Sequence, residues 1–423
     1  MDQATLNAPA LPRHSGTRAE FPSLAADPDV VYLDSAATTQ TPRRVIDAVA
    51  AHLADRTANP GRGGYPWATR ASRLIAEVRS RTAAFIGAEH PEEVVFTAGA
   101  TASLNAVAQG WGAAVLREGD EILYNPIDHS SLVLPWVALR QELAARGTRI
   151  NLVPYDMTAT GEADTADIRR KLSPRTRLIV TSHVHGVFGA RTTLRELRGH
   201  LDDSVHLLFD CSQSVGHVPV DVTELGADFA TFSGHKMFAL PGTGVLYCRR
   251  RVHGALAPFL PGGGPGVRLD RDAATGEPTV RRLAMPAAWE NGTPNTPGIV
   301  ALGEAIAFIE DHGLDRIGDQ VAALTLRLIA GLRALPRVEL LPGVAFASCR
   351  VGYGIVSFTV RGERADDVGF ALSALGFFVR TGQHCLSGDQ FRDSVRVGLH
   401  LYTTPEDVDR FLGALRDILE GGG

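Results

Sequence analysis

Short apolar runs alternate with amphipathic segments through the first two thirds of the chain, and this alternation restricts the fold more than any other feature. The apolar runs lie at 93–96, 121–124, 177–181, 206–209 and 244–247. The segments with helical spacing lie at 101–117, 131–146 and 191–200. Strands that alternate with helices form a mostly parallel sheet, because each helix carries the chain back to the start of the next strand. The pattern therefore predicts an α/β fold in which helices cover the sheet.

The pattern changes near residue 299, where long amphipathic helices and short strands follow one another. Helices are expected at 299–312, 315–335, 365–375 and from Pro405, and strands at 354–360 and 377–380. The Pro- and Gly-rich stretch from 258 to 298 is expected to be connecting loop. We therefore predict an N-terminal arm (1–30) that joins the small domain, a large domain (31–290) and a small α+β C-terminal domain (291–423).

Charge and cysteine usage argue against several classes of protein. A net charge of −5 gives no electrostatic basis for binding nucleic acid or an anionic membrane. No apolar run approaches the roughly 18 residues needed to span a bilayer, and the first residues lack a signal-peptide pattern. The four cysteines form no Cys-x-x-Cys pair, so we expect neither a metal site nor a disulfide framework. Such cysteine usage fits a reducing cytoplasm.

The segment SGHKMFALPGTG, at 233–244, places Lys236 where a strand runs into a tight turn. Taken alone, this residue is either a solvated surface lysine or a covalent cofactor site. Ligands of parallel sheets bind beyond the carboxyl ends of the strands. Polar segments follow several of the predicted strands at 97–99, 128–129, 183–186, 210 and 233–236. We expect these segments to converge on one edge of the sheet, which favours the cofactor site.

Several of these residues meet the chemical needs of pyridoxal phosphate (PLP). Asp210 ends an apolar strand, where a carboxylate either caps the next turn or pairs with the protonated ring nitrogen of the cofactor. Lys236 supplies the amine for the cofactor aldehyde. His129 is either structural or stacks on the ring and moves protons. Gln213 is placed to donate to the phenolic oxygen of the cofactor.

Two segments suit the cofactor phosphate. Ser233 and His235 flank Lys236 and carry small polar groups. The turn at 97–101 leads from a strand into a helix, and the free N–H groups at a helix start favour an anion. A turn of this kind is also common in plain packing, so it supports the site only together with the other residues.

The segment 379–396 carries two arginines and a cysteine. Arg380 and Arg396 match the planar geometry of a substrate carboxylate. Cys385 lies between them on a Gly-containing loop, where it is either a small loop residue or a thiol made nucleophilic by cationic neighbours. Cys211, beside Asp210, is interpreted as a packed residue next to the site.

Taken together, these motifs carry a family likeness that covers residues 30 to 415, nearly the whole chain. The blocks YLDSAA (32–37), DH (128–129), DCSQSVG (210–216), SGHK (233–236), GTPN (292–295) and RTGQHC (380–385) occur in that order. The sequence resembles class V aminotransferase-fold PLP enzymes, most closely group II cysteine desulfurases and selenocysteine lyases. The ten residues between Cys385 and Arg396 match the short catalytic loop of group II. The resemblance implies fold-type I architecture with a seven-stranded sheet, and a homodimer.

The resemblance also implies a role for each matching residue. Lys236 matches the Schiff-base lysine, Asp210 the partner of the ring nitrogen, His129 the stacking histidine and Gln213 the contact to the phenolic oxygen. The phosphate contacts match Ala100, Thr101, Ser233 and His235, with Thr293 reaching the phosphate of the other subunit. Arg396 matches the residue that binds the substrate carboxylate, with Arg380 nearby, and Cys385 the cysteine that takes up sulfur as a persulfide. The implied reaction converts L-cysteine to L-alanine and passes the sulfur to a thiol or scaffold acceptor.

Three positions depart from the family pattern. His185-Gly186 stands where Ser-Asn is usual, so His185 either replaces the asparagine contact to the cofactor or leaves it unmade. The phosphate turn reads Gly99-Ala100-Thr101, where two threonines are usual, and the segment 59–65 lacks a histidine found in many group II enzymes. Two alternatives therefore stay open. One is a PLP-dependent C–S lyase, epimerase or related enzyme acting on a larger amino acid. The other is a PLP-binding scaffold without activity.

Overall fold

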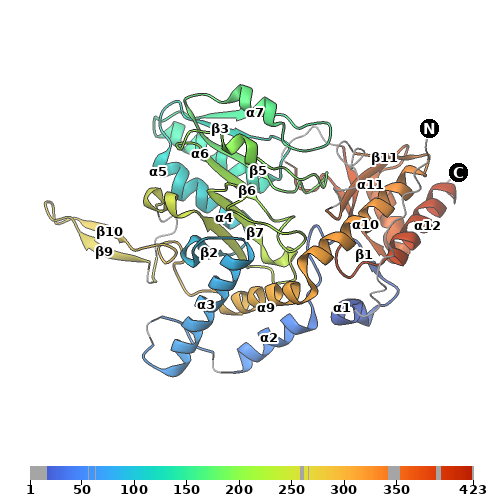
Figure 1. Ribbon diagram of the computed structural model, residues 1–423, viewed down its shortest axis with the longest axis horizontal. Helices are drawn as coiled ribbons and strands as arrows, with labels where there is room; N and C mark the ends of the chain where they lie inside the picture. Colours follow the sequence, from blue (N-terminus) through green and yellow to red (C-terminus); the bar gives the residue numbers. More distant parts are fainter. Residues whose placement is uncertain are drawn as a thin grey trace.

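The computed structural model describes residues 17–421 except 56, 62, 258–261, 265, 342–352 and 387–391. A seven-stranded sheet forms the centre of the larger part (Figure 1). Its strands, in spatial order, are β2 (Val94–Thr97), β8 (Gly244–Cys248), β7 (Phe229–Ser233), β6 (His206–Asp210), β5 (Thr176–Ser182), β3 (Glu121–Tyr124) and β4 (Asn151–Pro154). Only β8 runs against its neighbours in this sheet. The prediction of a mostly parallel sheet is confirmed.

Both faces of this sheet are buried, which explains the uninterrupted apolar runs of the sequence. Successive side chains of a strand point to opposite faces, so Leu208 packs into one core cluster while Leu207 and Phe209 pack into the other. The helices α4 (Ala100–Val107) and α6 (Ser130–Ala145) cover the first face. The second face is covered by α7 (Thr165–Lys171), α8 (Arg195–Arg198) and α9 (Thr296–His312). Next to α9 lie α2 (Arg43–Ala54) and α3 (Pro66–Phe85).

A four-stranded antiparallel sheet forms the C-terminal part, on the right of Figure 1. Its order is β11 (Val338–Leu340), β12 (Ile355–Val360), β15 (Ser394–Gly398) and β14 (Arg380–Gly382). It shares a core with α10 (Leu314–Arg333), α11 (Ala365–Ala374) and α12 (Pro405–Gly421). The N-terminal strand β1 (Val31–Tyr32) pairs with β13 (Phe377–Phe378) of this part. The domain boundaries near residues 30 and 290 stay predictions.

Two expectations about secondary structure were wrong. The stretch 258–298 contains an antiparallel hairpin of β9 (Val267–Arg271) and β10 (Pro278–Arg282), which projects to the left in Figure 1. Its turn is held by Asp272 Oδ1, which accepts from the backbone N–H groups of Ala274 and Thr275, so local turn chemistry outweighs the Pro and Gly content. The helix expected at 191–200 is limited to α8. Arg191 donates to His183, and the hydroxyl of Thr192 accepts from the Ala163 N–H, so these two residues are bonded outside any helix.

Among the described residues, no helix is long and apolar enough to cross a membrane.

Candidate active site

A cavity of about 250 Å³ lies where loops after β5, β6 and β7 meet the C-terminal sheet. It is lined by nearly all the site residues that the sequence predicted: Ala100, Thr101, His129, Asp210, Gln213, Ser233, His235, Lys236, Arg380, Cys385 and Arg396. Thr293 is exposed and does not line the cavity. The convergence of strand-end residues from distant parts of the sequence is what a mostly parallel sheet predicts.

Lys236 ends a short turn, η4 (Gly234–Lys236), directly after β7. Burial lowers the pKa of its amine and Arg396 adds to this, while Asp210 opposes it. The free amine is therefore more populated than in a solvated lysine, which suits a nucleophile. The chain contains one other lysine, Lys171, whose ammonium donates to Asp167 at 2.8 Å on α7. Lys236 is thus the lysine of the cavity.

The turn that carries Lys236 is fixed by Thr39. The Thr39 N–H and hydroxyl both donate to the carbonyl of His235, at 2.8 and 3.1 Å. The same hydroxyl accepts from the N–H of Phe238 at 2.7 Å. Phe238 has φ of +72°, in a region that costs about 1–2 kcal/mol for a residue with a side chain. Burial of its ring and the Thr39 bonds hold this strained turn in place.

Asp210 and Gln213 come from the end of β6. One oxygen of Asp210 accepts from the N–H of Ser212 at 2.9 Å, and its side chain is buried. The amide nitrogen of Gln213 donates to the carbonyl of Ala36 at 2.8 Å. Among the described residues, its Oε1 has no hydrogen-bond partner although it is buried. Such an atom at the wall of a cavity indicates a place for a polar ligand.

His129 is the N-cap residue of α6, and its Nδ1 accepts from the N–H of Ser131 at 3.1 Å. The ring therefore carries its proton on Nε2. Burial lowers the pKa of His129, and Lys236 and Arg396 lower it further against the attraction of Asp210. A neutral imidazole with a fixed tautomer lines the cavity, and its Nε2–H is able to donate a hydrogen bond there.

The start of α4 forms the part of the cavity that suits an anion. Ala100 N–H donates to the Ser233 hydroxyl at 2.9 Å, which connects the helix start to the end of β7. Thr101 and Ser131 share a hydroxyl hydrogen bond at 2.7 Å. A Cβ on Gly244 would lie 2.4 Å from the Cα of Gly99, so glycine is required for β8 to pass this turn. The remaining N–H groups of the first turn are left for a ligand.

Two arginines from the C-terminal sheet share one carboxylate. Arg380, on β14, donates to both oxygens of Asp34 at 3.0 to 3.2 Å, and Arg396, on β15, lies 3.6 Å from the same group. Arg396 also donates to the Gly186 carbonyl at 2.9 Å. Burial lowers the pKa of Arg396 to about 10, so the guanidinium keeps its charge at neutral pH. Its Nε has no partner among the described residues, which leaves donor capacity for a carboxylate.

Cys385 is the exposed one of the described cysteines, while Cys211 and Cys248 are buried free thiols. It has φ of +61°, and His384 before it has φ of +55°. Two successive non-glycine residues in this region are rare and cluster at functional sites. His384 Nε2 lies 2.8 Å from the hydroxyl of Ser394, and burial lowers the pKa of His384 to about 3, so the ring is neutral.

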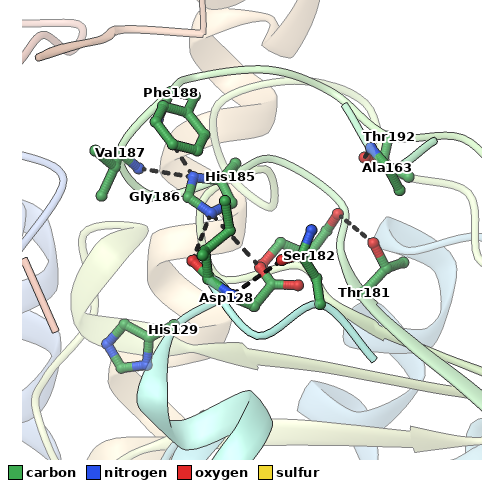
Figure 2. Close-up of polar contacts among 12 residues, drawn as sticks. Asp128, His129, Ala163, Thr181, Ser182, His185, Gly186, Val187, Phe188 and Thr192 are labelled. Atoms are coloured by element: carbon green, nitrogen blue, oxygen red, sulfur yellow. Dashed lines mark hydrogen bonds and ion pairs between the residues drawn. The ribbon is translucent and has the colours of Figure 1, made fainter. Parts of the chain in front are cut away.

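His185 lies behind the cavity and does not line it. Its Nδ1 accepts from the N–H groups of Val187 and Phe188, both at 3.3 Å (Figure 2). Its Nε2 is 3.2 Å from the carbonyl of Ile127. Its ring stacks on Phe188 with centroids 4.4 Å apart. His185 therefore does not take the place of the missing asparagine. Gly186 lines the cavity instead, and a Cβ there would lie 3.6 Å from Gln213 Nε2.

Sequence reasoning missed the roles of Asp34 and Thr39. Asp34 follows the apolar residues 31–33, so the rule that marked Asp210 also applies to it. Thr39 carried no signal, because its partners lie about 200 residues away.

Comparison with known proteins places this geometry in context. The sequence profile of class-V aminotransferases matches residues 31–411. A protein of Klebsiella pneumoniae named cysteine desulfurase is 35% identical over 95% of this chain and 97% of its own length. A probable cysteine desulfurase of Mycolicibacterium paratuberculosis is 34% identical over 96% of this chain, which spans only 58% of that relative.

Solved structures agree with these relatives. The apo cysteine desulfurase of Thermococcus onnurineus NA1 has a TM-score of 0.85 at 32% identity, covering 96% of this chain and 97% of its own. A mutant of C-DES with glycine covalently linked to its PLP cofactor has a TM-score of 0.77 at 25% identity, covering 95% and 99%. With a profile match over most of its length, the chain belongs to the class-V aminotransferase family.

Proposed function

We propose that this protein is a PLP-dependent cysteine desulfurase, which converts L-cysteine to L-alanine and receives the sulfur on Cys385. One observation carries the proposal: a single cavity joins the buried amine of Lys236 to the exposed free thiol of Cys385. A lyase or epimerase needs the amine but has no use for the thiol. The names of the similar proteins support the same activity.

The cavity fits PLP by the chemistry of its donors. Lys236 would hold the aldehyde carbon, Asp210 the protonated ring nitrogen and Gln213 the phenolic oxygen. The phosphate would lie at the start of α4, with Ala100, Thr101, Ser233 and His235 around it. The buried Oε1 of Gln213, which lacks a partner among the described residues, supports a polar ligand at this wall. When bound, PLP supplies an electron sink for the bonds to the substrate Cα.

The residues around that position bind the substrate and move its protons. Arg396 binds the substrate carboxylate through its unused donors, and Asp34 keeps both arginines oriented. The Lys236 amine, whose pKa is lowered by burial, accepts a proton from the substrate Cα. Neutral His129 presents its Nε2–H as a hydrogen-bond donor on the same cavity wall.

The sulfur step belongs to Cys385. Its thiolate attacks the substrate sulfur, so that a sulfur–sulfur bond forms and the carbon–sulfur bond breaks. The electron pair of the broken bond stays with the carbon fragment, which takes up protons and leaves as alanine. The persulfide on Cys385 is then reduced by an external thiol or by the thiol of an acceptor protein, and the exposed position of Cys385 supports such a transfer.

We further infer a homodimer that works in the cytoplasm. The resemblance assigns Thr293 to the phosphate of the other subunit, and the exposure of Thr293 outside its own cavity is consistent with that role. The free cysteines support a reducing compartment. Light scattering after size exclusion tests the assembly, and a monomer at micromolar concentration would contradict it.

The decisive experiment is anaerobic turnover of L-cysteine with dithiothreitol by the PLP-loaded protein. We expect equal amounts of alanine and sulfide from the native chain and neither from Cys385→Ala. Cys248→Ala, at a buried thiol outside the cavity, is the matched control and should keep the activity. A PLP-loaded protein that makes no alanine, or a Cys385→Ala variant as active as the native chain, rejects the proposal in favour of a lyase or epimerase acting on a larger amino acid.

A further inference from the structure

The loop that carries Cys385 is attached directly to the start of α6. The backbone N–H of Ser130 donates to the carbonyl of Cys385 at 2.8 Å, and the hydroxyl of Ser130 donates to the same carbonyl at 2.9 Å. Next to this contact, His129 and Leu386 form an isolated antiparallel bridge. One carbonyl oxygen thus accepts two hydrogen bonds from a residue 255 positions away in the sequence.

This contact acts on a strained piece of backbone. His384 and Cys385 have φ of +55° and +61°, a conformation that only glycine adopts without cost. The Leu386 N–H donates to the Gln383 carbonyl at 3.1 Å and closes the turn from within. Without external bonds, such a turn tends to relax to negative φ. The two bonds from Ser130 fix the carbonyl of Cys385, and with it the direction of the thiol.

The donor side of the contact is rigid. Ser130 is the first residue of α6, so its N–H has no partner inside the helix and is free to bind outside it. The residue before it, His129, is the N-cap of the same helix and lines the cavity. The helix start therefore sets the position of the His129 ring and of the thiol together.

We propose that Ser130 is a positioning residue for sulfur transfer, which holds the Cys385 thiol over the cavity through the Cys385 carbonyl. The proposal rests on the desulfurase function proposed above, and it adds a residue that does not line the cavity. Ser130 affects the step in which the thiol meets the substrate sulfur, and it leaves the binding of cofactor and of the substrate carboxylate unchanged.

The first position of a helix allows a clean test, because proline fits there. Ser130→Pro removes both donors at once, and the preceding His129 already has φ of −55° and ψ of +138°, which a following proline accepts. Ser130→Ala removes only the hydroxyl bond, and Ser130→Thr restores it. Thr165→Pro, at the exposed first position of α7, is the matched control for a proline at a helix start.

Two readouts separate positioning from general damage. The first is kcat and KM for alanine formation from L-cysteine. We expect kcat to fall about 2- to 10-fold in Ser130→Ala, as the loss of one hydrogen bond allows, and further in Ser130→Pro. KM, the cofactor absorbance and the melting temperature should stay those of the native chain, and Ser130→Thr and Thr165→Pro should keep the native kcat.

The second readout is the rate of Cys385 alkylation by iodoacetamide, followed by peptide mass spectrometry, which needs no turnover. We expect faster alkylation in Ser130→Pro, because the released thiol moves away from the cavity toward solvent. If the native chain forms no alanine but Ser130→Pro still raises the alkylation rate, the desulfurase function fails while the positioning of the thiol stands. If Ser130→Pro leaves both kcat and the alkylation rate unchanged, or lowers the alkylation rate, the proposal is overturned.

Discussion

The two sides of the cavity hold their reactive groups by different means. Lys236, on the sheet side, follows a buried parallel strand, and the strained Phe238 next to it is fully buried in the core. Cys385, on the C-terminal side, is exposed, and its own backbone has the strained positive φ. In the described part of the chain, the non-glycine residues with positive φ are Phe238, His384 and Cys385, all within two positions of Lys236 or Cys385. Strain is thus concentrated at the two reactive groups.

The difference matches what the proposed function requires of each side. A residue that holds the cofactor between turnovers and accepts a proton during them benefits from a site that the core holds still. A residue that receives sulfur and then gives it away must face both the cavity and the solvent. The C-terminal side is accordingly held by a few bonds to the sheet side, such as Arg396 to the Gly186 carbonyl and the Ser357 hydroxyl to the Val187 carbonyl, at 2.9 and 2.8 Å.

The largest effect is expected on the sheet side, from Lys236→Ala. The variant should lose the cofactor absorbance that borohydride removes, and alanine formation should fall by at least about 10³-fold, because nucleophile and proton acceptor are lost together. Absorbance spectra and alanine assays measure both. Lys171→Ala removes the other lysine, on α7, and should behave as the native chain. Persistence of a borohydride-sensitive absorbance in Lys236→Ala would falsify the assignment of the sheet side.

Arg396→Lys tests the C-terminal side. Lysine keeps the charge but loses the fork that serves Gly186, Asp34 and a carboxylate at once. We expect KM for L-cysteine to rise about 10- to 100-fold, with a smaller change in kcat, since a bidentate charged contact contributes roughly 1.5–3 kcal/mol. Steady-state kinetics measure this, with Arg43→Lys on the exposed face of α2 as control. An unchanged KM would show that the carboxylate binds elsewhere.

The smallest expected effect concerns a buried carboxyl beside His129. Burial raises the pKa of Asp128 from 3.8 to about 7. The folded state therefore keeps a proton on Asp128 that the unfolded chain releases above pH 4, so this group's contribution to stability falls as pH rises from about 4 to about 7. Asp128→Asn removes that dependence. Its melting temperature relative to the native chain should rise across this range, on the order of 2 °C or more.

The matched control for this comparison is Asp319→Asn, at an exposed carboxylate on α10. The melting temperature of this control should keep a constant difference from that of the native chain over the same pH range. If the difference in melting temperature between Asp128→Asn and the native chain stayed constant from pH 4 to pH 8, Asp128 would be ionised in the folded protein.

The sequence predicted the cavity residues of the sheet side better than the long-range contacts that hold the cavity together. Apolar runs mark buried strands, and polar residues just after them, such as Asp210 and Ser233, mark the cavity because parallel strands end at one edge. The contact between Ser130 and Cys385, or between Asp34 and Arg380, joins residues 255 and 346 positions apart. Such pairs depend on how two sheets meet, which no local pattern encodes. The hairpin of β9 and β10 was missed because its turn signal lay within a Pro- and Gly-rich stretch.

The scarcity of lysine has a practical consequence. With arginine serving almost every cationic position, the side-chain amines are Lys171 on α7 and Lys236 in the cavity. If Lys236 holds the cofactor as proposed, an amine-reactive surface can capture the protein by Lys171 or by the α-amine of the chain alone. Molecules immobilised in this way would adopt few orientations. The proposed delivery of sulfur from Cys385 to a candidate acceptor would then be measurable on a sensor surface, one acceptor after another.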